Sequence, residues 1–292
     1  MSMQMLDSSQ NLVKTGFDRL AKNIELSLVD YTSVSRGQAS IETYLGNYIT
    51  TFTTVLPGAF ARNTMVSPLK ETVVDLLVLF NQKHSSTFLP GDLLNKLYVT
   101  LSAKYPGTTI EEKTGSVYVP IENFKFRVQP GFITQQNRYL VPAPNWNDWV
   151  VYDTTGYKEQ FSKANIEHGG KLLHLVRMLK TWNHLSGKAF DGYFLELLVK
   201  DVLDRHEIIS YQAAINYIFK AIFSDVALRK HDPANQSMLV EGLHNLEGVV
   251  NAMLHVKSSY LVTKEAIQFE TEGNMRSALS SWGQLFPHHF PG

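Results

Sequence analysis

Hydrophobic positions follow two different spacings along this 292-residue chain. Apolar residues that recur every three or four positions predict amphipathic helices, and this spacing dominates the first 50 residues and most of the chain after residue 158. One more helix is expected after a Pro-Gly turn near residue 90. The expected helices cover residues 6–24, 33–52, 92–104, 170–182, 194–203, 211–223, 238–254 and 263–282.

The second spacing, which is typical of strands, occupies the middle of the chain. Residues 73–80 form an apolar run interrupted by one aspartate, and this pattern predicts a buried strand. Alternating apolar and polar residues predict further strands at 116–119, 123–128 and 138–142, whereas residues 143–155, rich in Asn, Pro, Trp and Asp, predict a loop. A front half with strands and an all-helical back half indicate two lobes with a cleft between them.

The composition narrows the function classes. Twenty-seven Lys and Arg balance 27 Asp and Glu, so general nucleic-acid binding is not expected. The chain has no Cys, which excludes disulfides and Cys-ligated zinc, and its ten His lack the spacing of a zinc site. The polar N-terminus lacks a signal-peptide core and no apolar run approaches the roughly 20 residues of a membrane span, so a cytoplasmic protein without a membrane segment is expected.

The stretch from residue 57 to residue 80 carries the pattern with the most chemical content. It combines a Gly turn, a run that can start a short helix, and a strand with Asp75 near its start. This is the layout of a nucleotidyltransferase palm, in which phosphates sit on the turn. Carboxylates at positions i and i+2 of the strand share one face, roughly 7 Å apart, and hold divalent metal ions.

Four stretches resemble the CD-NTase, or SMODS, family, the bacterial relatives of cyclic GMP-AMP synthase and oligoadenylate synthase. They are Gly58–Thr64 with Val73–Val78, Phe126–Phe132, Val176–Asn183 with Tyr193–Glu196, and Trp282–Pro291. The resemblance implies an α+β, two-lobed, polymerase-β-like nucleotidyltransferase fold. It places a mixed-sheet palm lobe with N-terminal spine helices in residues 1–157 and a helical lobe in residues 158–292.

The departures from the family pattern fall on chemistry rather than on packing. Ala59 stands where the family has its phosphate-binding Ser, and Val73 where it has its first metal-binding Asp. Arg127 stands at the third carboxylate, Gly192 at a Ser of the second lobe, and Asn63 at a Gly of the turn. Only Asp75 remains of the metal-binding carboxylates, so no metal site is expected.

Arg127 is the residue that most affects the expected chemistry. Its guanidinium keeps its charge at physiological pH, so beside Asp75 it would repel a divalent cation, and an ion pair could fill the former metal site. Asp75 is therefore either a remaining metal or ribose contact, the only catalytic candidate, or a strand residue paired with Arg127. Glu71, roughly 13 Å along the strand, and Glu122, in the next turn, are not expected to replace the missing carboxylates.

The resemblance also implies a set of nucleotide-binding candidates. They are Gly58, Ala59, Arg62, Arg127 and Lys180. Backbone N–H groups near Gly58 can face an anion, and a Lys is a compact phosphate binder. For Arg62 and Lys180 the alternative is a solvated surface residue.

Two functions from different classes remain open. The first is a catalytically degenerate protein without a cofactor that acts in bacterial antiphage (CBASS-like) signalling. It binds a nucleotide, a cyclic oligonucleotide or a protein partner from a defence operon. It acts either alone or beside an active homologue. The second is an active, Mg²⁺-dependent synthase that makes a cyclic or linear oligonucleotide second messenger from NTPs. Gly292 is either a conjugation point, as the C-terminus is in some family members, or a plain chain end.

Overall fold

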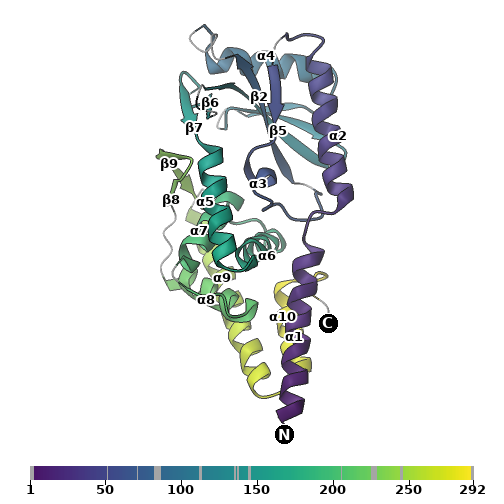
Figure 1. Cartoon of the computed structure of the whole chain (residues 1–292), viewed down its shortest axis with the longest axis vertical. Helices are drawn as coiled ribbons and strands as arrows, with labels where there is room; N and C mark the ends of the chain where they lie inside the picture. Colours follow the sequence, from purple (N-terminus) through teal and green to yellow (C-terminus); the bar gives the residue numbers. More distant parts are fainter. Residues whose placement is uncertain are drawn as a thin grey trace. The chain divides into compact units, whose positions relative to one another are not determined.

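The computed structural model describes residues 3–50, 52–70, 72–81, 87–111, 114–134, 136, 138–143, 146–204, 206–224, 229–243 and 246–290. The chain divides into two compact units (Figure 1). The helical unit comprises Met1–Glu25, Phe161–Asp232 and Ser237–Gly292, and the sheet unit comprises Leu26–Gln160 and Pro233–Gln236. The expected domain boundary after residue 157 stays a prediction.

A seven-stranded mixed sheet organises the sheet unit. Its strands are β1 (Phe52–Val55), β2 (Val73–Asn81), β3 (Thr109–Glu111), β4 (Ser116–Ile121), β5 (Phe124–Ile133), β6 (Tyr139–Pro142) and β7 (Trp149–Tyr152). The order is β1-β2-β5-β4-β3, while β6 pairs with β5 and β7 pairs with β6. The central pair, β2 and β5, is parallel, and the other pairs are antiparallel.

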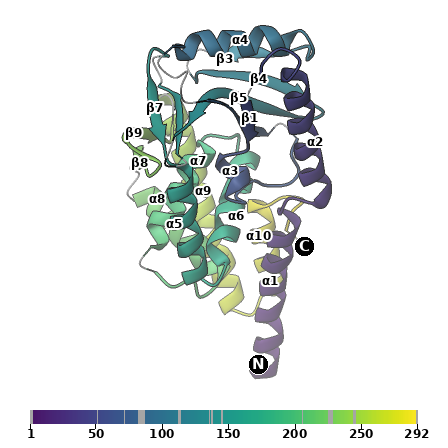
Figure 2. The same cartoon turned by 45° about the horizontal axis from the view of Figure 1, so that its top comes forward.

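One face of this sheet forms the core of the unit. Val74, Leu76 and Val78 of β2 point to this face and are fully buried, because alternate residues of a strand share a face. Two helices, α2 (Leu28–Leu45) and α4 (Pro90–Ser102), contribute apolar residues to the same core cluster. Figure 2 shows α4 lying along β3 and β4. The other face carries the odd-numbered side chains of β2 and β5 and is called the Asp75 face here.

Local sequence explains where the helices of the sheet unit begin. At the start of α2, the side chain of Ser27 accepts a hydrogen bond from the backbone of Asp30, and the Asp30 carboxylate accepts one from the backbone of Ser27. This reciprocal capping box satisfies two N–H groups that the first helical turn leaves free. The helix α4 starts with Pro90 in its first turn, where a missing N–H costs nothing. The short α3 (Gly58–Ala61) follows β1 directly.

Within the described residues, the helical unit contains six helices and the strands of a hairpin whose tip, Pro233–Gln236, belongs to the sheet unit. Its elements are α1 (Met3–Asn23), α6 (Lys171–Leu185), α7 (Gly192–Leu203), α8 (Tyr211–Ser224), β8 (Arg229–Asp232), β9 (Asn235–Glu241), α9 (Leu246–Thr271) and α10 (Met275–Leu285). A further helix, α5 (Thr154–Glu167), starts in the sheet unit and ends in this one. α1 and α10 lie side by side (Figures 1 and 2), where Phe17 meets Trp282 and Phe290 edge to face.

Four expectations about secondary structure were wrong. The expected loop at 143–155 contains strand β7, and the expected helix at 238–254 begins only at Leu246, because residues up to Glu241 form strand β9. The back half is therefore not all-helical. The helix expected over 33–52 ends at Leu45, after which Phe52 opens β1, and the helix expected over 263–282 is interrupted between Thr271 and Met275.

Candidate functional site

Asp75 and Arg127 lie opposite each other on the two central strands. The parallel register of β2 and β5 pairs the two residues directly, so their side chains emerge from the same face. Oδ1 of Asp75 accepts a hydrogen bond from Nε of Arg127 at 2.7 Å and lies 2.6 Å from Nη2. The pair is partly accessible, with 38% of the Arg127 side chain and 23% of the Asp75 side chain exposed. One carboxylate oxygen therefore receives two guanidinium donors at the sheet surface.

The Gly58 turn closes the other side of Asp75. Gly58 has φ of 68°, in the left-handed region that glycine tolerates and other residues rarely adopt. A β-carbon at this position would collide with Oδ2 of Asp75. The absence of a side chain at Gly58 therefore allows the turn to approach the carboxylate, and the structure brings Gly58, Asp75 and Arg127 together.

The donor set at this place does not fit a divalent metal ion. Position 73, two residues before Asp75 on the same face, is a valine with 42% exposure, and the facing residue of Asp75 is a cation. Within the described ranges, no group of three or more His, Asp or Glu residues has the arrangement of a metal site. Glu122 lies 3.6 Å from Arg36 in an ion pair, and Glu71 lies outside the described residues. A lone carboxylate that already carries a guanidinium offers two metal ions too few ligands.

The charge balance of the pair follows from its geometry. The carboxylate of Asp75 raises the pKa of Arg127, and burial acts against it. The phenols of Tyr118 and Tyr152 add to the rise. Tyr118 lies directly opposite Arg127 in the register of β4 and β5, and burial raises the pKa of its own phenol. The guanidinium is thus a permanent cation bound to the carboxylate of Asp75.

Arg62 and Ala59 occupy the turn as packing residues. The Arg62 side chain is buried, with 7% exposure, and its guanidinium lies 5.1 Å from the ring centre of Tyr157. This distance is typical of a cation–π contact. Ala59 is half-buried and packs against the core of the sheet unit. The proposed phosphate contact of Arg62 stays a prediction, and its burial is a property that the sequence did not indicate.

Lys180 belongs to the helical unit, where it pairs with a buried carboxylate. Its Nζ donates to Oε2 of Glu196 at 3.1 Å, from α6 to α7. The side chain of Lys180 is 11% exposed and that of Glu196 is fully buried. Gly192 is the first residue of α7 and lies next to Lys180. A β-carbon at position 192 would lie 3.9 Å from Cε of Lys180. The binding role predicted for Lys180 stays a prediction.

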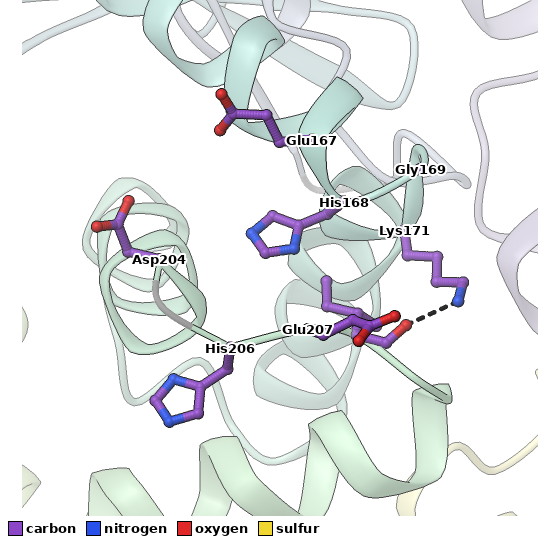
Figure 3. Close-up of a pocket in the computed structure, with 8 residues that line it drawn as sticks. Glu167, His168, Gly169, Lys171, Asp204, His206 and Glu207 are labelled. Atoms are coloured by element: carbon purple, nitrogen blue, oxygen red, sulfur yellow. Dashed lines mark hydrogen bonds between the residues drawn. The ribbon is translucent and has the colours of Figure 1, made fainter.

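A hollow of about 430 Å³ lies in the helical unit, and none of the predicted site residues is among those that line it (Figure 3). It is lined by Glu167, His168, Gly169, Lys171, Asp204, His206, Glu207 and Ile208. Lys171 donates to the backbone oxygen of Ile208 at 2.7 Å, and His206 shares a hydrogen bond of 2.9 Å with Tyr217. The ammonium group of Lys171 thus holds the backbone at Ile208 in place.

Sequence reasoning missed three residues around the ion pair. Lys125 and Tyr118 flank Arg127 along and across the strands, and Tyr152 belongs to a strand that was expected to be a loop. The alternation of Lys125 and Arg127 was a signal that both side chains share one face. Tyr152 was missed because residues 143–155 were expected to form a loop, although its partner strand was predicted at 138–142.

Across the described part of the chain, no helix has the length and hydropathy that crossing a membrane requires.

Comparisons with known proteins agree on one family. The domain described as Second Messenger Oligonucleotide or Dinucleotide Synthetase matches residues 12–165. A probable cyclic nucleotide synthase of Bacillus cereus is 22% identical over 276 residues, which cover 80% of this chain and 81% of that protein. A cyclic AMP-AMP-AMP synthase of an Acinetobacter species is 24% identical over 256 residues, which cover 82% of this chain and 72% of that protein.

The fold is shared with solved structures as well. The structure of CdnC from E. coli MS115-1 in complex with HORMA-deltaN superposes with a TM-score of 0.70 at 14% identity, covering 96% of this chain and 98% of that chain. A likeness at this identity establishes the fold alone. The expected α+β nucleotidyltransferase fold, with a mixed sheet and a helical C-terminal part, is confirmed.

Proposed function

This chain belongs to the Second Messenger Oligonucleotide or Dinucleotide Synthetase family, and we propose that it acts in cyclic nucleotide signalling by binding rather than by nucleotidyl transfer. The observation that carries the proposal is the ion pair of Arg127 with Asp75. Two-metal transfer requires carboxylates that hold two ions about 3.5–4 Å apart. In this chain the remaining carboxylate is bound to a guanidinium, and the neighbouring position is Val73.

The proposed ligand is a nucleotide or cyclic oligonucleotide, or a protein partner from a bacterial antiphage operon, in the cytoplasm. Two features support a binding role. The nucleotidyltransferase scaffold is retained, and a solved structure with this fold, E. coli CdnC, was determined together with a HORMA partner. The relatives are named as synthases of cyclic nucleotides, and these names support a ligand of that chemical class.

A second candidate function is an active synthase of a cyclic or linear oligonucleotide from NTPs. The names of the two curated relatives favour it. Such an enzyme would need Asp75 to leave Arg127 and two further carboxylates to join it around Mg²⁺. Glu122 is held by Arg36 and lies in a left-handed turn, which speaks against this rearrangement.

A product assay separates the two functions. The purified chain is incubated with each NTP and with all four together, in the presence of Mg²⁺ or Mn²⁺, and nucleotides are resolved by anion-exchange chromatography. The Acinetobacter cyclic AMP-AMP-AMP synthase serves as the positive control. We expect no product above a protein-free control. A product that requires the divalent ion would overturn the binding proposal in favour of the synthase.

A further inference from the structure

Two cations stand next to each other on the Asp75 face of the sheet. Lys125 and Arg127 are two residues apart on β5, so their side chains share one face and lie roughly 7 Å apart at about 3.3 Å per residue. Lys125 faces Val73 and Arg127 faces Asp75 in the register with β2. Lys125 is exposed and Arg127 is half-buried. On β2 and β5, the face on which relatives with the full motif carry carboxylates thus has two positive charges against one negative charge, and Glu111 of β3 adds a second carboxylate further along the same face.

A phenol group extends this arrangement. Tyr118 lies opposite Arg127 on β4, and its ring is half-buried. Its phenol contributes to the electrostatic environment of the Arg127 guanidinium. A phenol O–H can donate a hydrogen bond to an anionic oxygen, as a guanidinium and an ammonium do.

The ion pair leaves part of the guanidinium for a ligand. Asp75 uses a single oxygen to accept from Nε and Nη2 of Arg127. Arg presents five N–H donors, and the outer edge formed by its two terminal nitrogens suits two oxygens of a phosphate. Arg127 therefore offers donors to an incoming anion while Asp75 fixes its orientation, and Lys125 adds a point charge at the exposed end of the face.

We propose that Lys125 and Arg127, with Tyr118 beside them, form a site for a polyphosphate group that binds without a divalent metal and that Mg²⁺ weakens rather than strengthens. The proposal rests on the non-catalytic function argued above and names the ligand chemistry of the same site. In a metal-dependent enzyme the ion bridges carboxylates and phosphates. At this site the guanidinium and the ammonium take over the positive charge. Mg²⁺ neutralises the phosphate oxygens and is repelled by the two cations, so it acts as a competitor.

The test is isothermal titration of the full chain with inorganic tripolyphosphate, ATP and GTP, each in EDTA and in Mg²⁺. We expect binding in EDTA that Mg²⁺ weakens about fivefold or more, which corresponds to the loss of about one phosphate contact of about 1 kcal/mol. Equal affinities for the three probes assign the site to the phosphate chain. Tighter binding of one nucleotide adds a base contact to the same site.

Matched variants locate the site. Lys125→Gln and Arg127→Gln should each weaken tripolyphosphate binding about fivefold, whereas Lys96→Gln, an exposed lysine on α4, should leave it unchanged. Circular dichroism checks that each variant is folded. The double variant Asp75→Asn/Arg127→Gln is a second test of Arg127, because it removes the ion pair without leaving Asp75 as an unpaired carboxylate. Absence of binding in EDTA, binding that requires Mg²⁺, or an equal effect of Lys96→Gln would overturn the polyphosphate site. The titrations measure binding and do not depend on product formation. The product assay therefore remains an independent test of the non-catalytic function.

Discussion

Arg127 donates to Asp75 through Nε and approaches the same oxygen, Oδ1, through Nη2 at 2.6 Å. The parallel register of β2 and β5 sets the two residues directly opposite each other, so no loop rearrangement is needed to make the pair. The Arg127 guanidinium, a permanent cation, thereby lies beside Asp75, the one metal-binding carboxylate of the family pattern that this chain keeps.

The pair should contribute modestly to stability, because both side chains are partly accessible to water. In a double-mutant cycle of Asp75→Asn, Arg127→Gln and the double variant, we expect a coupling free energy of about 1 kcal/mol. Urea unfolding followed by circular dichroism measures each free energy of unfolding. A coupling of zero would mean that the two side chains do not interact in solution.

Gly58→Ala should cost more stability than a change of the ion pair. The new β-carbon is forced into a left-handed backbone conformation and against the Asp75 carboxylate, which should lower the free energy of unfolding by about 1–3 kcal/mol. Gly91→Ala in α4 is the matched control, because its β-carbon meets nothing within 4 Å. There we expect no loss, or a gain of about 0.5 kcal/mol. Similar losses at both positions would contradict the assigned role of the Gly58 turn.

Lys180→Met should destabilise the helical unit rather than merely change its surface charge. The substitution removes the cation that lies 3.1 Å from the fully buried carboxylate of Glu196, and we expect a loss of about 3 kcal/mol. The double variant Lys180→Met/Glu196→Gln should recover part of this loss, because the buried charge is gone. As a comparison, Lys163→Met on the exposed pair with Glu167 should change thermal stability very little. A mild effect of Lys180→Met, equal to that of the surface control, would place Lys180 among ordinary surface residues.

Stability should fall as the pH drops below about 6.5. Burial, helped by Arg177, lowers the pKa of His174 from its ordinary value of 6.5, while the carboxylates of Glu25 and Asp18 act in the opposite direction. His174 shares a 2.6 Å hydrogen bond with the Tyr211 hydroxyl, whose pKa is raised to about 12 by burial. Above pH 6.5 both folded and unfolded chains hold a neutral imidazole. Below it the unfolded chain binds the proton first, so the folded state loses stability until the pH passes the lowered pKa.

His174→Gln tests this dependence, since glutamine keeps a hydrogen-bonding group and does not titrate. The fall in melting temperature between pH 7.5 and pH 5.5 should be smaller in the variant than in the original chain. Part of the fall should remain, because burial lowers the pKa of His289 as well. An identical pH profile in the two proteins would exclude His174 as a source of the effect.

Strong local patterns made the central part of the site predictable. The apolar run at residues 73–80 indicated β2, and the alternation at 123–128 indicated β5. The resemblance to the family then suggested that Asp75 and Arg127 could meet, and the register brings them together. An i, i+2 spacing assigns side chains to one face of a single strand, so the meeting of two residues on different strands was predicted from the family resemblance.

Features that depend on distant partners could not be predicted in the same way. β7 has only four residues between polar and proline-rich neighbours, and its strand identity comes from pairing with β6. The apolar residues at 238–240 suit a helix or a strand, and pairing with β8 decides for a strand. The burial of Arg62 over Tyr157, nearly a hundred residues later, has no local signal in the sequence.

Whether Arg127 takes the place of the metal ion is tested by a Mn²⁺ titration followed by electron paramagnetic resonance. The titration is performed on the original chain and on Val73→Asp/Arg127→Asp, which places carboxylates beside Asp75 on the same face, with residues 73 and 75 roughly 7 Å apart along β2. We expect the original chain to bind no Mn²⁺ at micromolar concentration and the folded double variant to bind it. Stoichiometric Mn²⁺ binding by the original chain, unchanged in the variant, would contradict this expectation.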